Sequence, residues 1–245
     1  LRTLSIYTGD YNEFLSISDQ IINYGISKNE YGIYISDLAR RAYTLIVTFE
    51  KLDEAEKIIS EMEKILKDKS DVISFNNMDV WSKLMIINSY KYLNQWSKAD
   101  KLVEASFGGL ASINIFDKAL KAKQDGRFKD AIILYLKSLE SSDFDHYTLN
   151  YDLAQCYMEI NDYQNAMKYF DVMKNNTYWG QGHMKRFYHG KNILYSGLAN
   201  LELKNYRIAK SKIETFLEIW DKAPESLKDK KLARQALKKI NKATS

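Results

Sequence analysis

The sequence predicts an all-α fold, a solenoid of about six antiparallel helix pairs closed by a C-terminal helix. Three observations predict it. Five times a bulky residue is followed three positions later by alanine, and another large residue comes four positions after each alanine. A polar turn precedes most of the bulky residues, and the 245 residues include 10 Gly and a single Pro. Helix interiors disfavour glycine and proline, so this composition suits a chain built almost entirely of helices.

Each alanine of this pattern is expected where two paired helices cross. A small side chain there lets the two backbones approach to the short end of the roughly 8–10 Å range of helix spacings. The bulky residue is expected to begin the second helix of a pair and to plug the end of the hairpin. The later large residue then lies one turn beyond the alanine on the same face. The five pairs are Leu52/Ala55, Trp96/Ala99, Phe128/Ala131, Tyr163/Ala166 and Tyr206/Ala209.

In the first part of the chain, residues 1–7 are expected to be helical, and Gly9-Asp10 to precede a second helix that begins at Tyr11. A helix with apolar residues on one face then leads to Leu52. Residues 67–79 are polar and are expected to form a loop. The next pair has Trp96 at the start of its second helix.

In the second part of the chain, glycines, serines and a proline mark the expected ends of helices. Phe107-Gly108-Gly109 and Ser141-Ser142-Asp143 are expected to separate hairpins, and 175–190 is expected to be irregular because it contains three glycines. Pro224 can begin a final helix over about 225–242, whose apolar face would close the last repeat while Lys and Arg face water. We therefore expect helical repeats over 1–223 and a basic capping helix over 224–245.

The pattern between about Leu84 and Met173 resembles the tetratricopeptide repeat (TPR), a helix–turn–helix unit with a period of about 34 residues. The bulky positions from Tyr11 to Tyr206 are spaced 41, 44, 32, 35 and 43 residues apart, so two gaps suit that period and the others need longer helices or loops. The resemblance implies a right-handed superhelix whose first helices line a concave groove for a protein or peptide. Residues 216–223, followed by Pro224, resemble the end of TPR regions in bacterial multidomain signalling proteins, which implies a regulatory part of a longer, cytoplasmic protein.

Mapping the groove of such an array onto this chain gives a set of candidate partner-binding residues. They are Arg40, Trp81, Asn88, Lys91, Phe116, Lys123, Tyr151, Gln155 and Met158, with Thr44, Leu84, Leu120, Leu194 and Leu198 on the same turns. An apolar centre with lysines at its edge suits a peptide with hydrophobic anchors and an acid. For Leu84, Leu120 and Leu198, packing between neighbouring repeats is an equal alternative. The Lys/Asn/Arg clamp of chaperone-binding TPR domains is matched only at Asn88, which argues against that role.

A basic, aromatic stretch offers an alternative function. Phe187 and Tyr188 stand among basic residues that could contact phosphate or nucleic acid, and the last twenty residues carry seven Lys or Arg against one acid. The basic positions are Lys185, Arg186, His189 and Lys191. The other interpretation is that the aromatic residues pack while the charges are solvated. The rest of the chain is nearly neutral, so nucleic acid is the less favoured partner.

No motif for an enzyme occurs in the sequence. There is no Gly-rich phosphate loop, no Gly-x-Ser-x-Gly elbow and no His-Glu-x-x-His. We therefore expect no catalytic residues, no metal and no cofactor. No run approaches the roughly 20 apolar residues that span a bilayer. The chain begins at Leu1 inside a helical pattern, which suggests a piece of a longer protein, and an exposed groove would favour self-association.

Overall fold

The computed structural model of this chain describes residues 2–107, 111–140, 147–175 and 182–244. Side chains are described for residues 2–106, 115–140, 147–173 and 187–244. Within these ranges the chain forms thirteen α-helices and one short 3₁₀ helix, Phe75–Asn77. The helices divide into two compact units, Leu1–Gly109 and Leu110–Ser245. The division expected at 223/224, between helical repeats and a capping helix, stays a prediction.

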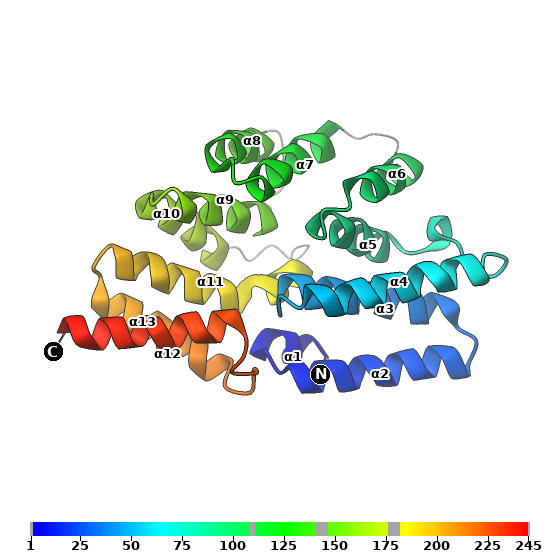
Figure 1. Ribbon diagram of the computed structural model, residues 1–245, viewed down its shortest axis with the longest axis horizontal. Coiled ribbons are helices and arrows are strands. Elements are labelled where there is room, and N and C mark those ends of the chain that lie inside the picture. Colours follow the sequence, from blue (N-terminus) through cyan, green and yellow to red (C-terminus); the bar gives the residue numbers. More distant parts are fainter. Residues whose placement is uncertain (1, 108–110, 141–146, 176–181, 245) are drawn as a thin grey trace. The chain divides into compact units, whose positions relative to one another are not determined.

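The first unit contains α1 (Arg2–Thr8), α2 (Tyr11–Ser27), α3 (Tyr31–Val47), α4 (Leu52–Asp68), α5 (Val80–Tyr92) and α6 (Trp96–Phe107). The second contains α7 (Ala111–Gln124), α8 (Phe128–Glu140), α9 (Tyr147–Glu159), α10 (Tyr163–Asn175), α11 (Gly182–Glu202), α12 (Tyr206–Ile219) and α13 (Lys228–Thr244). Helices pack in consecutive pairs from α1/α2 to α11/α12, and α13 packs on α11 and α12 (Figure 1). The expectation of an all-α chain of helix pairs followed by a C-terminal helix is confirmed.

The turn inside each pair is the same. Two positions before every second helix lies a residue with φ between 53° and 73°, and Asn29 has this conformation between α2 and α3. The next N–H returns to a carbonyl near the end of the first helix, as Gln95 N does to Tyr90 O at 2.8 Å. This Schellman type of ending satisfies carbonyls that the helix end leaves free. Each second helix begins at the bulky residue two positions after this left-handed residue, as predicted.

The five alanines of the repeated pattern, Ala55, Ala99, Ala131, Ala166 and Ala209, are all 0% exposed. Four of the large residues that follow them are also buried, and Val103 is half-buried. This burial is what a helix crossing requires of small residues. Leu52 is different, because its side chain is 46% exposed. The expectation that it plugs the end of its hairpin is therefore wrong. Phe49, three residues earlier in the chain, is buried instead and packs against Phe14, with 5.7 Å between the ring centroids.

Helix α11 begins at Gly182, so the expectation of an irregular segment up to Gly190 is wrong for 182–190. Residues 176–181 lie outside the described residues. Gly190 is tolerated within the helix because the indole of Trp220 occupies the space where a side chain would lie. A Cβ built there would approach Trp220 Cε2 to 2.8 Å. The glycine therefore reflects helix packing and not a loop.

Helix α13 begins at Lys228, three residues later than expected. The buried Lys230 Nζ donates hydrogen bonds to Ala223 O at 2.6 Å and Asp221 O at 2.8 Å, and so holds the turn after α12. The neighbouring Asp229 is buried as well. The expectation that Lys and Arg of this helix face water is therefore wrong for Lys230.

Candidate functional site

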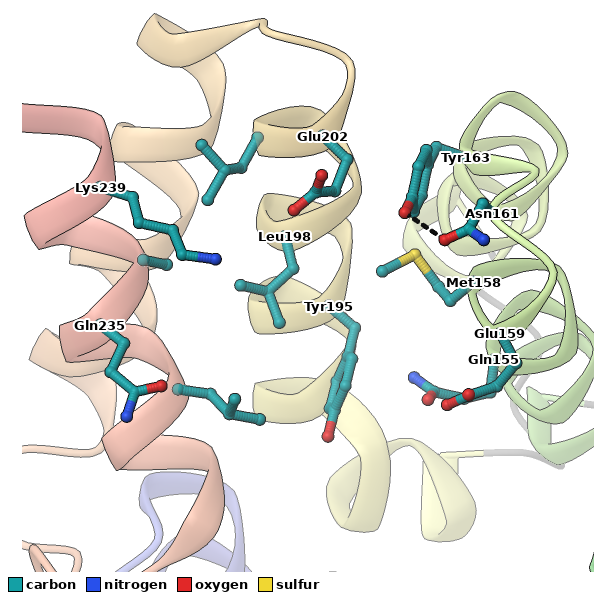
Figure 2. A pocket seen from close by; sticks show the side chains of 13 residues that line it. Gln155, Met158, Glu159, Asn161, Tyr163, Tyr195, Leu198, Glu202, Gln235 and Lys239 are labelled. Atoms are coloured by element: carbon teal, nitrogen blue, oxygen red, sulfur yellow. Dashed lines mark hydrogen bonds between the residues drawn. The ribbon is translucent and has the colours of Figure 1, made fainter. Parts of the chain in front are cut away.

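A pocket of about 320 Å³ lies between α9, α11 and α13 in the second unit (Figure 2). Helix α9 and the start of α10 form one wall, α13 forms the other, and α11 lies between them. The lining residues are Gln155, Met158, Glu159, Asn161, Tyr163, Tyr195, Leu198, Leu201, Glu202, Leu232, Gln235, Ala236 and Lys239. All of them belong to one unit.

Helical spacing explains why these side chains meet. On α11, Tyr195, Leu198 and Glu202 follow each other at intervals of three and four and so share one face. The same intervals relate Leu232 and Lys239 through Gln235 and Ala236 on α13. One stripe from each of three helices thus faces a common space. Two of the residues predicted for partner binding, Gln155 and Met158, lie in it, together with Leu198.

The pocket has an apolar centre, and each of the three helices that line it also carries a charged side chain. Met158 points from α9 towards α11, where Leu198 lies (Figure 2). The exposed amine of Lys239 reaches in from α13, while the carboxylates of Glu159 and Glu202 lie on α9 and α11. The α13 wall therefore carries a positive charge, whereas α9 and the intervening α11 carry negative charges.

Two polar groups of the wall differ in how they are satisfied. Tyr163 Oη donates to Asn161 Oδ1 at 2.6 Å. Burial, and next the charge of Glu202, raise the pKa of the Tyr163 hydroxyl above its ordinary value. The buried Gln155 Nε2, by contrast, has no hydrogen-bond partner among the described residues. A buried donor without an acceptor is unfavourable by about 1–3 kcal/mol, so an acceptor that enters the pocket would be stabilised there.

A buried ion pair is linked to the pocket through the lining residue Tyr195. Lys191 Nζ lies 3.3 Å from Asp229 Oδ2, and both side chains are at most 5% exposed. Tyr195, which lines the pocket, donates from its hydroxyl to Asp229 Oδ1 at 3.0 Å. These contacts join α11 to α13, so they set the distance between two walls of the site.

The same ion pair bears on the proposed phosphate contact. Lys191 was expected to contact phosphate, yet its amine is held inside the protein by Asp229. His189 is half-buried and has interactions within the protein. The side chains of Lys185 and Arg186 lie outside the described residues. Phe187 and Tyr188 are buried, as the packing interpretation of this stretch expects.

Three more of the predicted groove residues of the second unit take part in packing or ion pairing within the protein. Lys123 forms an ion pair with the buried Asp152 at 2.7 Å. Tyr151 is buried in an aromatic cluster, with its ring centroid 4.9 Å from that of Tyr188. Phe116 is half-buried and packs 6.0 Å from Tyr135. Leu120 and Leu194, from the same turns, are buried in the core, which agrees with the packing alternative for Leu120.

The remaining predicted residues lie in the first unit. Trp81 is 48% exposed at the start of α5, and Asn88 is half-buried on the same helix. Lys91 is buried and has partners within the protein. Burial lowers the pKa of the half-buried Arg40 on α3, against the opposing effect of the Asp79 charge. Thr44 on α3 is buried, and Leu84 on α5 is half-buried. These residues and the pocket belong to different units, so the structure does not test one continuous groove.

Sequence reasoning missed the contribution of α13 and the two acids. Leu232, Gln235 and Lys239 were assigned only to a capping helix, although their spacing already places them on one helical face. Glu159 and Glu202 are the last residues of α9 and α11, where an acid is easily taken for a solvated end. A search for charged residues at equivalent ends of successive first helices would have found them.

The part of the chain that the structure describes contains no group of three or more His, Cys, Asp or Glu side chains that could hold a metal ion. None of its helices is long and apolar enough to cross a bilayer. Burial raises the pKa of the Cys156 thiol to about 12, so this side chain is a packed thiol and not a nucleophile at neutral pH.

Comparison with models of known protein families gave no match, and no curated protein sequence matched the chain.

Proposed function

We propose that this chain is a non-enzymatic, TPR-like scaffold that binds a protein or peptide segment. Its helix pairs would continue as a right-handed superhelix, and the region would serve as a docking or regulatory part of a longer cytoplasmic, signalling protein. The observation that carries the proposal is the pocket between α9, α11 and α13, where one face of each helix lines a common space.

The composition of the pocket suits a peptide better than a reaction. Leu198, Met158 and Leu232 supply an apolar centre for an anchoring side chain. The unpartnered amide of Gln155 can donate to a peptide carbonyl. The identical turns and buried alanines of successive pairs support the repeat, and a repeat array presents its first helices side by side as a binding surface.

A peptide-display selection tests this function. Random peptides shown on phage are selected on the parent protein, and the enriched peptides are synthesised and measured by fluorescence polarisation. We expect Leu198→Arg and Met158→Arg each to weaken binding at least about tenfold, which corresponds to about 1.4 kcal/mol. Circular dichroism must show that both variants keep the parent helicity.

Ile133→Arg is the matched control, because Ile133 is 65% exposed on α8 and lies outside the pocket. This variant should bind the peptides within about twofold of the parent. The proposal fails if selection enriches no peptide family, or if peptides bind the parent and both pocket variants alike.

A further inference from the structure

We propose that the pocket selects peptides whose apolar anchor lies between an acidic and a basic residue, with the acid towards α13 and the base towards α9 and α11. This inference rests on the proposed peptide-binding function and names the class of peptide that the same site prefers.

The first step of the argument is the arrangement of charge across the pocket. Lys239 lies on the α13 wall, and Glu159 and Glu202 lie at the ends of α9 and α11 (Figure 2). None of these three charges has an ion-pair partner among the described residues. A positive charge on the α13 wall and negative charges on α9 and on the intervening α11 will favour a segment of complementary polarity, since potentials across interfaces are arranged to match.

Other charged residues of α13 form ion pairs within the protein. Asp229 binds Lys191, Lys230 lies 2.9 Å from Glu225, and Arg234 lies 2.7 Å from Glu225. These pairs use charge to hold the helix and the preceding turn in place. The amine of Lys239 instead points into the space between α13 and α11 (Figure 2).

The second step concerns what the pocket requires between the charges. Met158 and Leu198 offer an apolar centre, which favours a Leu- or Met-sized anchor. Gln155 Nε2 is a buried donor without an acceptor among the described residues, and a backbone carbonyl next to the anchor would satisfy it. A polyanion such as nucleic acid fits poorly, because two of the three charged lining residues are carboxylates.

Five pools of labelled decapeptides test this preference by fluorescence polarisation at low salt. Each pool has Leu at its centre, flanked by acid then base, base then acid, acid on both sides, base on both sides, or Gln on both sides. We expect one of the two mixed pools to bind the parent about tenfold tighter than the Gln pool, because exposed pairs each give only a few-fold in affinity. This advantage should shrink in 0.5 M salt.

Three variants assign the charges. Lys239→Gln should weaken the mixed pool about threefold but should not weaken the both-basic pool, because it removes a like charge that faces one of the two bases. Glu159→Gln with Glu202→Gln should weaken the mixed pool and the both-basic pool but should not weaken the both-acidic pool, for the same reason. Lys238→Gln, at the exposed neighbour that does not line the pocket, is the matched control and should change no pool by more than about 1.5-fold.

The outcomes separate the two proposals. If the mixed and Gln pools bind the parent equally and Leu198→Arg weakens both, the peptide function stands and the charge preference is wrong. The preference is also wrong if the both-basic pool binds tightest or Lys239→Gln has no effect. If no pool binds the parent and the display selection has also failed, the peptide function itself is overturned.

Discussion

Seven residues of the described chain share one left-handed backbone conformation but differ in the side chain they carry. Gly126 has φ of 73°, and the lysine at 204 has φ of 60° in the equivalent turn between α11 and α12. Glycine adopts positive φ about as readily as negative φ, whereas a Cβ makes this region unfavourable by about 1–2 kcal/mol. The turn of the last pair therefore stores strain that the turn between α7 and α8 does not.

Substitutions at these two turns should change the free energy of unfolding in opposite directions. We expect Lys204→Gly to raise the free energy of unfolding by about 0.5 kcal/mol, since relief of strain exceeds the added freedom of the unfolded chain. Gly126→Ala should lower it by about 1 kcal/mol through the backbone alone, because a Cβ there meets no atom within 4 Å. Urea unfolding measures both, and a loss of stability in Lys204→Gly would contradict the interpretation.

These turns also show what a single residue reveals from sequence. Asn94, Gly126 and Asn161 stand in segments predicted as turns, because Asn and Gly tolerate positive φ. Glu50 takes the same conformation, yet glutamate has no preference for turns, so no local pattern could identify it. The buried Phe49 precedes it, but its packing depends on Phe14, far away in the sequence.

At the scale of helices, three tyrosine hydroxyls connect α4 to its neighbours. Tyr11, Tyr34 and Tyr90 donate to Glu54, Glu61 and Glu63 respectively. Tyr90 is 4% exposed, and burial, then its hydrogen bond to Glu63 and the charge of that residue, raise the pKa of its hydroxyl well above the ordinary value of 10.0. The folded protein therefore keeps a proton there that the unfolded chain loses above pH 10.

The sign of this linkage gives a prediction for Tyr90→Phe. The stabilisation from Tyr90 is complete below pH 10 and is lost as the pH rises above it, by at most about 1.4 kcal/mol per pH unit for one proton. At pH 7 we expect the variant to be less stable by about 1 kcal/mol, through loss of the hydrogen bond to Glu63. Between pH 10 and 11.5 this difference should shrink or reverse.

Urea unfolding of the parent and Tyr90→Phe at pH 7, 9, 10.5 and 11.5 measures the difference. A difference that stays constant to pH 11.5 would show that the unfolded and folded states ionise alike at this tyrosine. Tyr24→Phe is the matched control, since Tyr24 is 54% exposed on α2, and it should stay within about 0.5 kcal/mol of the parent at pH 7.

The helices themselves could be predicted where a local pattern carries them. Five second helices begin at the bulky residue that precedes a buried alanine, and α2 begins at Tyr11 after Gly9-Asp10, so all six begin at the expected residue. The length of α11 could not be predicted, because Gly190 is explained only by Trp220, thirty residues later. The role of α13 as a pocket wall was missed for the same reason, since its stripe acquires meaning only beside α9 and α11.

At the scale of the whole molecule, the site and its supports lie in one unit. Every lining residue of the pocket falls between Leu110 and Ser245. The buried ion pair Lys191/Asp229, which contacts the lining residue Tyr195, falls there as well. The groove predicted from sequence instead drew on both halves of the chain, because a repeat pattern treats successive first helices as equivalent. Packing breaks that equivalence, since Lys91 and Tyr151 are buried at positions where the pattern expects contact with a partner.

This division predicts that residues 110–245 fold and bind without the first unit. Repeat helices draw their stability from neighbouring helices, and the pairs from α7/α8 to α11/α12, with α13, form one compact unit. We expect a cooperative urea transition, a helical circular dichroism spectrum, and affinity within about threefold of the full chain for the peptides selected on it. Residues 1–109 should bind these peptides at least about tenfold more weakly. If 110–245 folds but loses the peptides, the pocket is only part of the binding surface, and exposed residues of the first unit such as Trp81 supply the rest.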